Sequence, residues 1–301
     1  MNSGYKFVSP ATINFACLGI ENLAVAIDNP ANEITGYICE KNKEKIIEEF
    51  TFDRQDTKQT KHKLEKFALD FCAYFQCQTF VTLNIANKIG FDSGLGNFES
   101  NIVGIAGALN GLLNLHLDKN KIFNATHEIC TQLGFEVNYA SIAAGIFGGM
   151  ISYDSTTQKK IHKIYTPKGI YFSIYSSKSF NTDKIKQKIA LDEIVSSNIV
   201  SLIYSLIVSD LETIKDSIIN NKYLELTVND LAHFKEMHKS ALENGAYGTG
   251  YTALGSSYFI VYGNTVIKSH ADDILQKYLT GNKIDFKKHD SIINQIGMVK
   301  A

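Results

Sequence analysis

The chain is almost free of arginine: Arg54 is the only one in its 301 residues, and the remaining strongly basic residues are lysines. Arginine is the side chain that normally clamps a carboxylate or a phosphate through two parallel hydrogen bonds. An anion site in this chain must therefore use lysine, backbone N–H groups or a metal ion.

Cysteine pairs of the type found in zinc sites are also missing. The five cysteines include no CxxC pair, and no spacing of histidine and cysteine suits zinc. An odd number of scattered cysteines is typical of a cytoplasmic protein whose thiols stay reduced and mostly buried. We therefore expect a cytoplasmic location and neither a disulfide framework nor a zinc site.

A long apolar run and a strong net charge are absent as well. The most apolar stretch, residues 102–117, is interrupted by Asn110, Asn114 and His116 and is shorter than the ~20 residues that span a bilayer. The N-terminus has no apolar signal core. The net charge of −1 gives no basic field that would attract nucleic acid or an anionic membrane. We expect neither partner.

A short glycine loop organises the first half of the chain. The strand-like run 79–85 leads into residues 89–100, in which Gly94 and Gly96 flank Leu95, and the apolar helix-like run follows. Glycines let backbone N–H groups approach a ligand, and a helix N-terminus behind them favours phosphate. The sequence therefore predicts a phosphate cradle. The alternative is an ordinary loop whose helix is capped by Asn97.

Periodicity indicates a mixture of strands and helices in both halves. We expect strands at 5–8, 22–27, 33–39, 46–52, 79–85, 160–165, 169–175, 258–262 and 283–287. We expect helices at 61–75, 102–117, 124–133, 183–194, 197–208, 210–219, 228–243 and 266–279, with a polar turn at 118–121. This order predicts an α+β protein of two mixed domains, with a boundary near residue 155.

Four segments carry a resemblance to a known superfamily. They are Pro10-Ala11-Thr12-Ile13-Asn14 with Leu18-Gly19; Gly94-Leu95-Gly96; Glu136 with Gly148-Gly149; and Gly245-Ala246 with Gly248 and Gly255. In type, order and spacing they resemble the motifs of the galactokinase–homoserine–mevalonate–phosphomevalonate kinases, and homoserine kinase most closely. The agreement runs from about Phe7 to near the C-terminus.

The resemblance implies an ATP-binding domain at residues 1–155, like the second domain of a ribosomal small-subunit protein, and a ferredoxin-like domain at 156–301. It implies transfer of the γ-phosphate of ATP to a small alcohol or amino acid such as homoserine, with Mg²⁺ as cofactor. A homodimer is a family-level expectation. The implied site residues are Ser93, Gly94, Leu95, Gly96 and Asn97 around the phosphates, Ser100 as a displaced hydroxyl, Glu136 on Mg²⁺, Asn14 on the substrate and Lys186 on the substrate carboxylate.

The chain departs from the family at the loop itself. Asn97 and Phe98 stand where the family has serines, and Glu99 brings a negative charge into the first helical turn. The substrate-contacting Asp-Asn pair of the family is replaced by Ala140 and Ser141. Two alternatives to a homoserine kinase therefore stay open: a relative that keeps the fold and binds a ligand without catalysis, and a kinase for another small alcohol.

Overall fold

The structure is a computed structural model of the whole chain. It describes residues 4–15, 22–39, 47–52, 58–77, 79–154, 160–178, 180, 193–219, 233–252 and 257–301. No helix in these ranges is both long enough and apolar enough to cross a membrane.

The first half of the chain builds a seven-stranded sheet. Its strand order is β11-β1-β2-β4-β3, and β5 and β6 continue it from the far end of β2. The strands are β1 (Tyr5–Asn14), β2 (Leu23–Ile38), β3 (Ile47–Phe52), β4 (Val81–Ala86), β5 (Met150–Asp154), β6 (Lys160–Ile164) and β11 (Val299–Lys300). β3 and β4 are parallel, and every other pair in this sheet is antiparallel.

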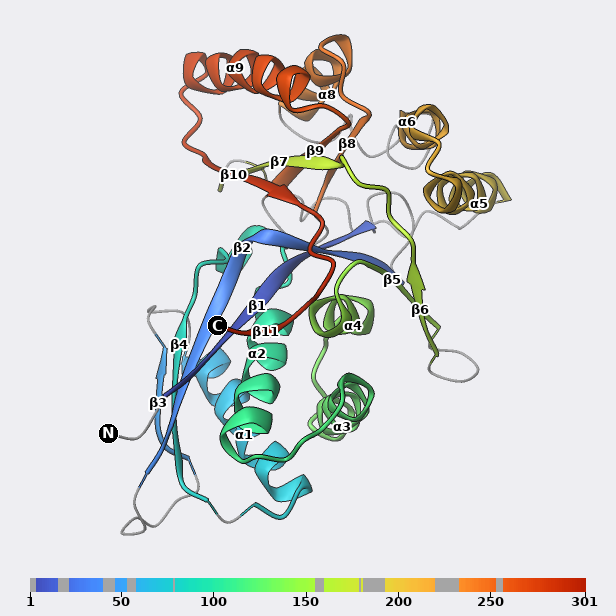
Figure 1. Cartoon of the computed structure of the whole chain (residues 1–301). Helices are drawn as coiled ribbons and strands as arrows, with labels where there is room; N and C mark the ends of the chain where they lie inside the picture. The colour runs from blue at the N-terminus through green and yellow to red at the C-terminus, as the bar shows by residue number, and fades with distance from the viewer. Residues whose placement is uncertain are drawn as a thin grey trace.

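Four helices cover one face of this sheet (Figure 1). They are α1 (Lys58–Tyr74), α2 (Asn97–Leu112), α3 (Lys119–Gln132) and α4 (Tyr139–Phe147). The central helix α2 packs directly on β1 and β2. Close packing there depends on Gly104, because a Cβ at this position would lie 2.0 Å from the Ile34 side chain. The apolar run predicted to be a buried helix is therefore the helix on which the loop is mounted.

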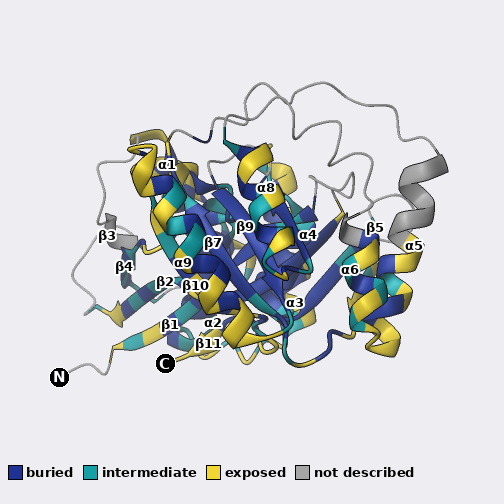
Figure 2. Cartoon of the chain, turned by 90° about the horizontal axis from the view of Figure 1, so that it is seen from above, coloured by how far each residue is buried: buried dark blue, intermediate teal, exposed yellow. Residues whose placement is uncertain are grey.

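The second half builds a four-stranded antiparallel sheet of order β10-β7-β9-β8. Its strands are β7 (Tyr171–Ser176), β8 (Gly248–Tyr251), β9 (Ser257–Tyr262) and β10 (Lys287–Ile292). Helices α8 (Phe234–Glu243) and α9 (Thr265–Gly281) cover its outer face, and α5 (Glu193–Val208) and α6 (Leu211–Ile219) lie to one side (Figure 1). Figure 2 shows β7 and β9 as buried strands beneath the exposed outer faces of α8 and α9.

The C-terminal segment returns to the first sheet. After β10, Asn294 donates its N–H to Ala26 O (2.9 Å), and β11 pairs with β1. Strand β6, which follows the predicted boundary at residue 155, pairs with β5. The two-domain α+β architecture is thus present, with both β6 and β11 in the first sheet, while the division into 1–155 and 156–301 stays a prediction.

Four predicted elements differ from the structure in informative ways. The strands expected at 22–27 and 33–39 form the single strand β2. The pairing with β1 shifts from Pro10↔Ala31 to Ala11↔Ile27, so residues 28–30 leave the ladder between these pairs. Pro30 is accommodated there because a bulged residue needs no ladder hydrogen bond.

The turn predicted at 118–121 is instead the start of α3. The Asp118 carboxylate accepts the Lys121 N–H (2.8 Å) and caps the helix, which therefore begins five residues before Asn124, the predicted cap. The final edge strand is also displaced: β10 begins at Lys287, and residues 283–286 precede it outside the sheet.

Candidate functional site

The glycine loop lies between the end of β4 and the start of α2. A one-turn 3₁₀ helix, η2 (Phe91–Ser93), leads into Gly94 and Gly96, which both have left-handed backbone angles (φ 70° and 65°). Side chains rarely adopt these angles, so both positions require glycine. Gly96 is the N-cap residue of α2 and contributes no side chain, which leaves the N–H groups of the first turn directed at the loop.

The loop is fixed from both halves of the molecule. Thr12 of β1 donates its N–H to Leu95 O (3.1 Å). Thr252, which follows β8 in the second sheet, donates its hydroxyl to Ser93 O (2.6 Å). The Ser93 hydroxyl donates to Gly90 O (2.6 Å). The loop is therefore a rigid backbone feature at the junction of the two sheets, as a phosphate cradle requires.

Asn97 belongs to a buried amide network and does not act as the cap of α2. Its Oδ1 accepts hydrogen bonds from Asn32 (2.8 Å) and Asn101 (3.2 Å). Asn32 Oδ1 accepts the N–H groups of Lys88 (2.9 Å) and Ile89 (3.1 Å), which enter the loop. The alternative of an Asn97-capped helix is therefore wrong, and the asparagine instead ties α2 to β2 and to the start of the loop.

Ser100 is also committed within the protein. Its hydroxyl is buried and donates to Ser9 O of β1 (3.0 Å). Ser93 and Ser100, the two loop hydroxyls named by sequence, thus both hold backbone carbonyls.

Glu99 is a carboxylate that the structure places beside Gly96 of the loop. It is half-buried in the first turn of α2, and its Oε1 accepts the N–H of Asn138 at the start of α4 (3.1 Å). Burial raises the pKa of this carboxyl, and the hydrogen bonds from the N–H groups of Asn138 and of Glu99 itself partly offset the rise.

The other predicted site residues are Asn14, Glu136 and Lys186, of which the structure describes the first two. Asn14 ends β1 and, because strand side chains alternate, lies on the same face as Thr12, which touches the loop. Glu136 is exposed in the connection between α3 and α4, two residues before Asn138. Lys186 and Gly255, like Arg54, lie outside the described residues.

Lysine side chains are the obvious groups to neutralise a phosphate at the loop, but in the described part of the chain the lysine next to it in sequence is already paired. Lys88 stands just before the loop, but its ammonium pairs with Glu33, which also pairs with Lys6. In the described ranges no group of three or more histidine, cysteine and acidic side chains could hold a metal ion. A cation bound at the loop would therefore need oxygen atoms from a bound group such as a phosphate.

Sequence reasoning missed the role of Thr12. Its side chain is 2% exposed, and its Oγ1 has no hydrogen-bond partner among the residues that the structure describes. A Cβ at Gly96 would lie only 2.3 Å from this oxygen, so Thr12 lies against the loop. The signal was present, because Thr12 stands two residues before Asn14 in a predicted motif.

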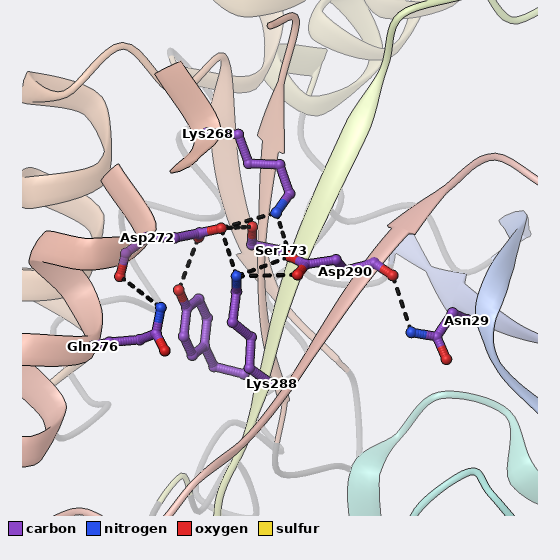
Figure 3. A network of polar contacts seen from close by, with 8 residues as sticks. Asn29, Ser173, Lys268, Asp272, Gln276, Lys288 and Asp290 are labelled. Carbon is purple, nitrogen blue, oxygen red and sulfur yellow. Dashed lines mark hydrogen bonds and ion pairs between the residues drawn. The ribbon is translucent and has the colours of Figure 1, made fainter. Parts of the chain in front are cut away.

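A second cluster of buried polar groups lies between β7, β10 and α9 (Figure 3). Asp272, 2% exposed, accepts hydrogen bonds from Ser173 and Tyr175 (2.8 Å each) and pairs with Lys268 and Lys288 (2.8 Å each). Both lysines also pair with Asp290. Burial alone would raise the pKa of Asp290, but the two lysines outweigh it and lower that pKa. Each charge has an opposite partner, so this cluster is structural.

Comparisons with known proteins give the same fold. A homoserine kinase from Cytophaga hutchinsonii superposes with a TM-score of 0.87 at 22% identity and covers all of this chain and 98% of its own. The chain has the fold of the galactokinase–homoserine–mevalonate–phosphomevalonate kinases. L. major mevalonate kinase in complex with R-mevalonate superposes with a TM-score of 0.72 at 12% identity, covering 96% of this chain and 98% of its own. The predicted resemblance is confirmed at the level of the fold.

Sequence comparison is more restricted. No known protein-family profile matches the chain. The homoserine kinase of Campylobacter hominis is 26% identical over 187 residues. This alignment covers 58% of the present chain and 61% of that relative, so the chain matches less than two thirds of the relative's length.

Proposed function

We propose that the protein is a kinase that transfers the γ-phosphate of ATP to the hydroxyl of a small molecule, and that L-homoserine is the substrate to test first. The observation that carries this proposal is the rigid Gly94–Gly96 loop at the N-terminus of α2, in the fold shared with the homoserine and mevalonate kinases. Phosphoryl transfer of this kind needs mostly positioning and neutralisation of charge.

The loop fits a polyphosphate in two respects. Gly94 and Gly96 present backbone with no side chain in the way. Although Glu99 occupies its own N–H, the N–H groups of Asn97 and Phe98 in the first turn of α2 are donors with a partial positive charge. In this proposal Ser93 to Asn97 surround the phosphates through their backbone, and Ser100 supports α2 from behind. The missing arginines are no obstacle, because backbone donors replace them.

Mg²⁺ would supply the neutralisation that the described lysines do not. In nucleotide sites Mg²⁺ typically takes only one or two carboxylates from the protein. Glu136 is the ligand predicted from sequence and remains a proposal. Its connection reaches the first turn of α2 through Asn138, which donates to Glu99, and through Phe135, whose ring packs on Phe98.

The proposal for substrate binding concerns Asn14, which lies on the same face of β1 as Thr12 at the loop. We propose that its amide contacts the substrate. The clamp role of Lys186 and a homodimeric assembly also stay proposals.

One observation favours the alternative of a ligand-binding protein without catalysis. Asn97 replaces a family serine, and its side chain is consumed by the amide network with Asn32 and Asn101. The alternative of another alcohol substrate rests on Ala140 and Ser141, which are buried in α4 and offer no carboxylate to the amino group of homoserine.

The test is calorimetric titration of the full chain with MgATP, followed by ADP-release assays over homoserine and other small alcohols. ATP binding with homoserine-dependent turnover supports the proposal. Binding with turnover on another alcohol shifts the substrate, and binding without any turnover supports the non-catalytic alternative. The absence of binding at millimolar MgATP would refute the kinase proposal.

A further inference from the structure

The glycine loop has two oxygen-bearing side chains beside it that come from different elements. Thr12 reaches it from β1, and its buried hydroxyl has no hydrogen-bond partner within the described residues. Glu99 reaches it from the first turn of α2. A buried hydroxyl without a partner is unfavourable, so such a hydroxyl at a ligand site indicates a group that satisfies it.

Both side chains approach the same glycine. An ideal Cβ on Gly96 would lie 2.3 Å from Thr12 Oγ1 and 3.8 Å from Glu99 Oε2. Both distances start from the same Cβ position, so the two oxygens are at most about 6 Å apart. For comparison, two oxygen ligands on opposite sides of one Mg²⁺ are roughly 4 Å apart. This upper limit allows both oxygens to contact one cation.

The remaining hydroxyl and amide groups of the loop are already in use. Ser93 donates to Gly90 O, Ser100 donates to Ser9 O, and Asn97 Oδ1 accepts from two asparagines. Thr12 is therefore the hydroxyl left to take the place of the missing loop serine. Glu99 is also positioned to contact a cation. The Asn138 N–H holds its Oε1, while Oε2 faces Gly96.

We propose that Thr12 Oγ1 and the Glu99 carboxylate are the protein's ligands for the divalent cation that accompanies the nucleotide. The inference rests on the proposed function and deepens it, because it moves the metal site from Glu136 to a hydroxyl and a carboxylate at Gly96. It also explains how a helix N-terminus that holds polyphosphate tolerates a glutamate, because a bound cation would neutralise both negative groups.

The experiment measures the dissociation constant of ATP for the full chain by calorimetry, once with Mg²⁺ and once with a chelator. For the wild type we expect Mg²⁺ to tighten binding tenfold or more. Glu99→Gln keeps the acceptor for the Asn138 N–H but loses the charge, and Thr12→Val keeps the shape but loses the hydroxyl. Both should remove most of the Mg²⁺-dependent gain, and Thr12→Ser should retain it. With Mn²⁺ in place of Mg²⁺, spin-resonance broadening reports metal binding directly.

Matched controls come from α3. Thr126→Val removes another buried hydroxyl without a partner in the described structure, and Glu128→Gln removes an exposed carboxylate. Both should leave the Mg²⁺ dependence unchanged. Thermal melts of all variants separate loss of a ligand from loss of the fold.

Two results overturn the inference while the kinase proposal stands. They are full Mg²⁺ dependence in Glu99→Gln and Thr12→Val, and loss of that dependence in Glu136→Gln alone. A wild type that binds no ATP under either condition overturns both the inference and the proposed function.

Discussion

In the lysine–aspartate cluster around Asp272 the buried charges are paired with one another, whereas at the glycine loop a buried hydroxyl has no described partner. In the cluster, Asp272 is surrounded by four donors, and both lysines also reach Asp290. At the loop, Thr12 has a hydroxyl without a described partner, and Glu99 has one oxygen anchored by Asn138 and one facing Gly96.

This difference distinguishes a structural cluster from a binding site better than charge does. Both regions contain buried acidic groups, but each charge of the cluster has an opposite partner, whereas Glu99 at the loop has no described cationic partner and lies beside a hydroxyl, that of Thr12, without a described hydrogen bond. Saturated networks stabilise and fix the fold, whereas unsatisfied groups at a rigid backbone feature are available to a ligand. Variants in the cluster should therefore change stability, and variants at the loop should change ligand binding.

The largest effect is expected in the cluster. Asp272→Asn leaves Lys268 and Lys288 with Asp290 as their only acidic partner in the cluster and should lower the free energy of unfolding by about 3–5 kcal/mol. Urea unfolding measures this change. ATP affinity, extrapolated to conditions in which the variant is folded, should stay within twofold of the wild type. A stable variant with impaired ATP binding would place the cluster in the site.

The next effect concerns His289 in β10, which is buried on the sheet face opposite to Asp290. Its pKa is lowered to about 4 by burial and by the charge of Lys287. In the unfolded chain the histidine pKa is near 6.5, so the unfolded chain takes up a proton at this imidazole more readily than the folded chain does. The free energy of unfolding is therefore fully present above pH 6.5 and falls as the pH drops towards 4. The loss is up to about 3 kcal/mol. Unfolding between pH 7 and 4.5 should show a weaker pH dependence in His289→Gln, and identical profiles would contradict the prediction.

A smaller loss of stability with a larger loss of function is expected at the loop. Gly96→Ala puts a side chain at φ 65° and a methyl group against Thr12 Oγ1, which should destabilise the protein by about 1–3 kcal/mol and weaken ATP binding at least tenfold.

Gly134→Ala is the matched control for this variant. Gly134 has nearly the same φ of 64°, but no atom lies within 4 Å of an added Cβ. It should lose about 1 kcal/mol from backbone strain and keep its ATP affinity. Equal affinities in the two variants would argue against the loop as the binding site.

The smallest effect is expected for a surface pair on α6. Glu212 and Lys215 are 3.8 Å apart and exposed, so Glu212→Gln should change stability by no more than about 0.5 kcal/mol. Urea unfolding of this variant gives the baseline for Asp272→Asn. A change of 2 kcal/mol or more would mean that surface pairing, rather than burial, dominates the electrostatic stability.

The sequence predicted the parts of the fold that depend on local pattern. The glycine loop between β4 and α2 follows from backbone requirements of glycine and from the apolar run behind it, and α1 and α9 follow from their periodicity. The two-segment prediction for β2 failed because Pro30 is a local break signal, whereas the strand continues through a bulge that is fixed by pairing with β1.

The site was less predictable because its contacts join distant segments. Asn97 and Ser100 had the right positions for a ligand, but their partners, Asn32 and Ser9, lie 65 and 91 residues away. The saturated cluster around Asp272 likewise joins β7, α9 and β10 and has no local motif. Which polar groups remain unused depends on such long-range contacts, and that is why Thr12 emerged only from the structure.

The proposed function requires that the Gly94–Gly96 loop binds the phosphates of a nucleotide. Calorimetric titration of the wild-type chain with MgATP and, separately, with adenosine measures this. We expect saturable binding of MgATP at millimolar concentration or below and at least tenfold weaker binding of adenosine, because the phosphates carry the contacts. No binding of MgATP, or equal affinity for adenosine, would contradict it.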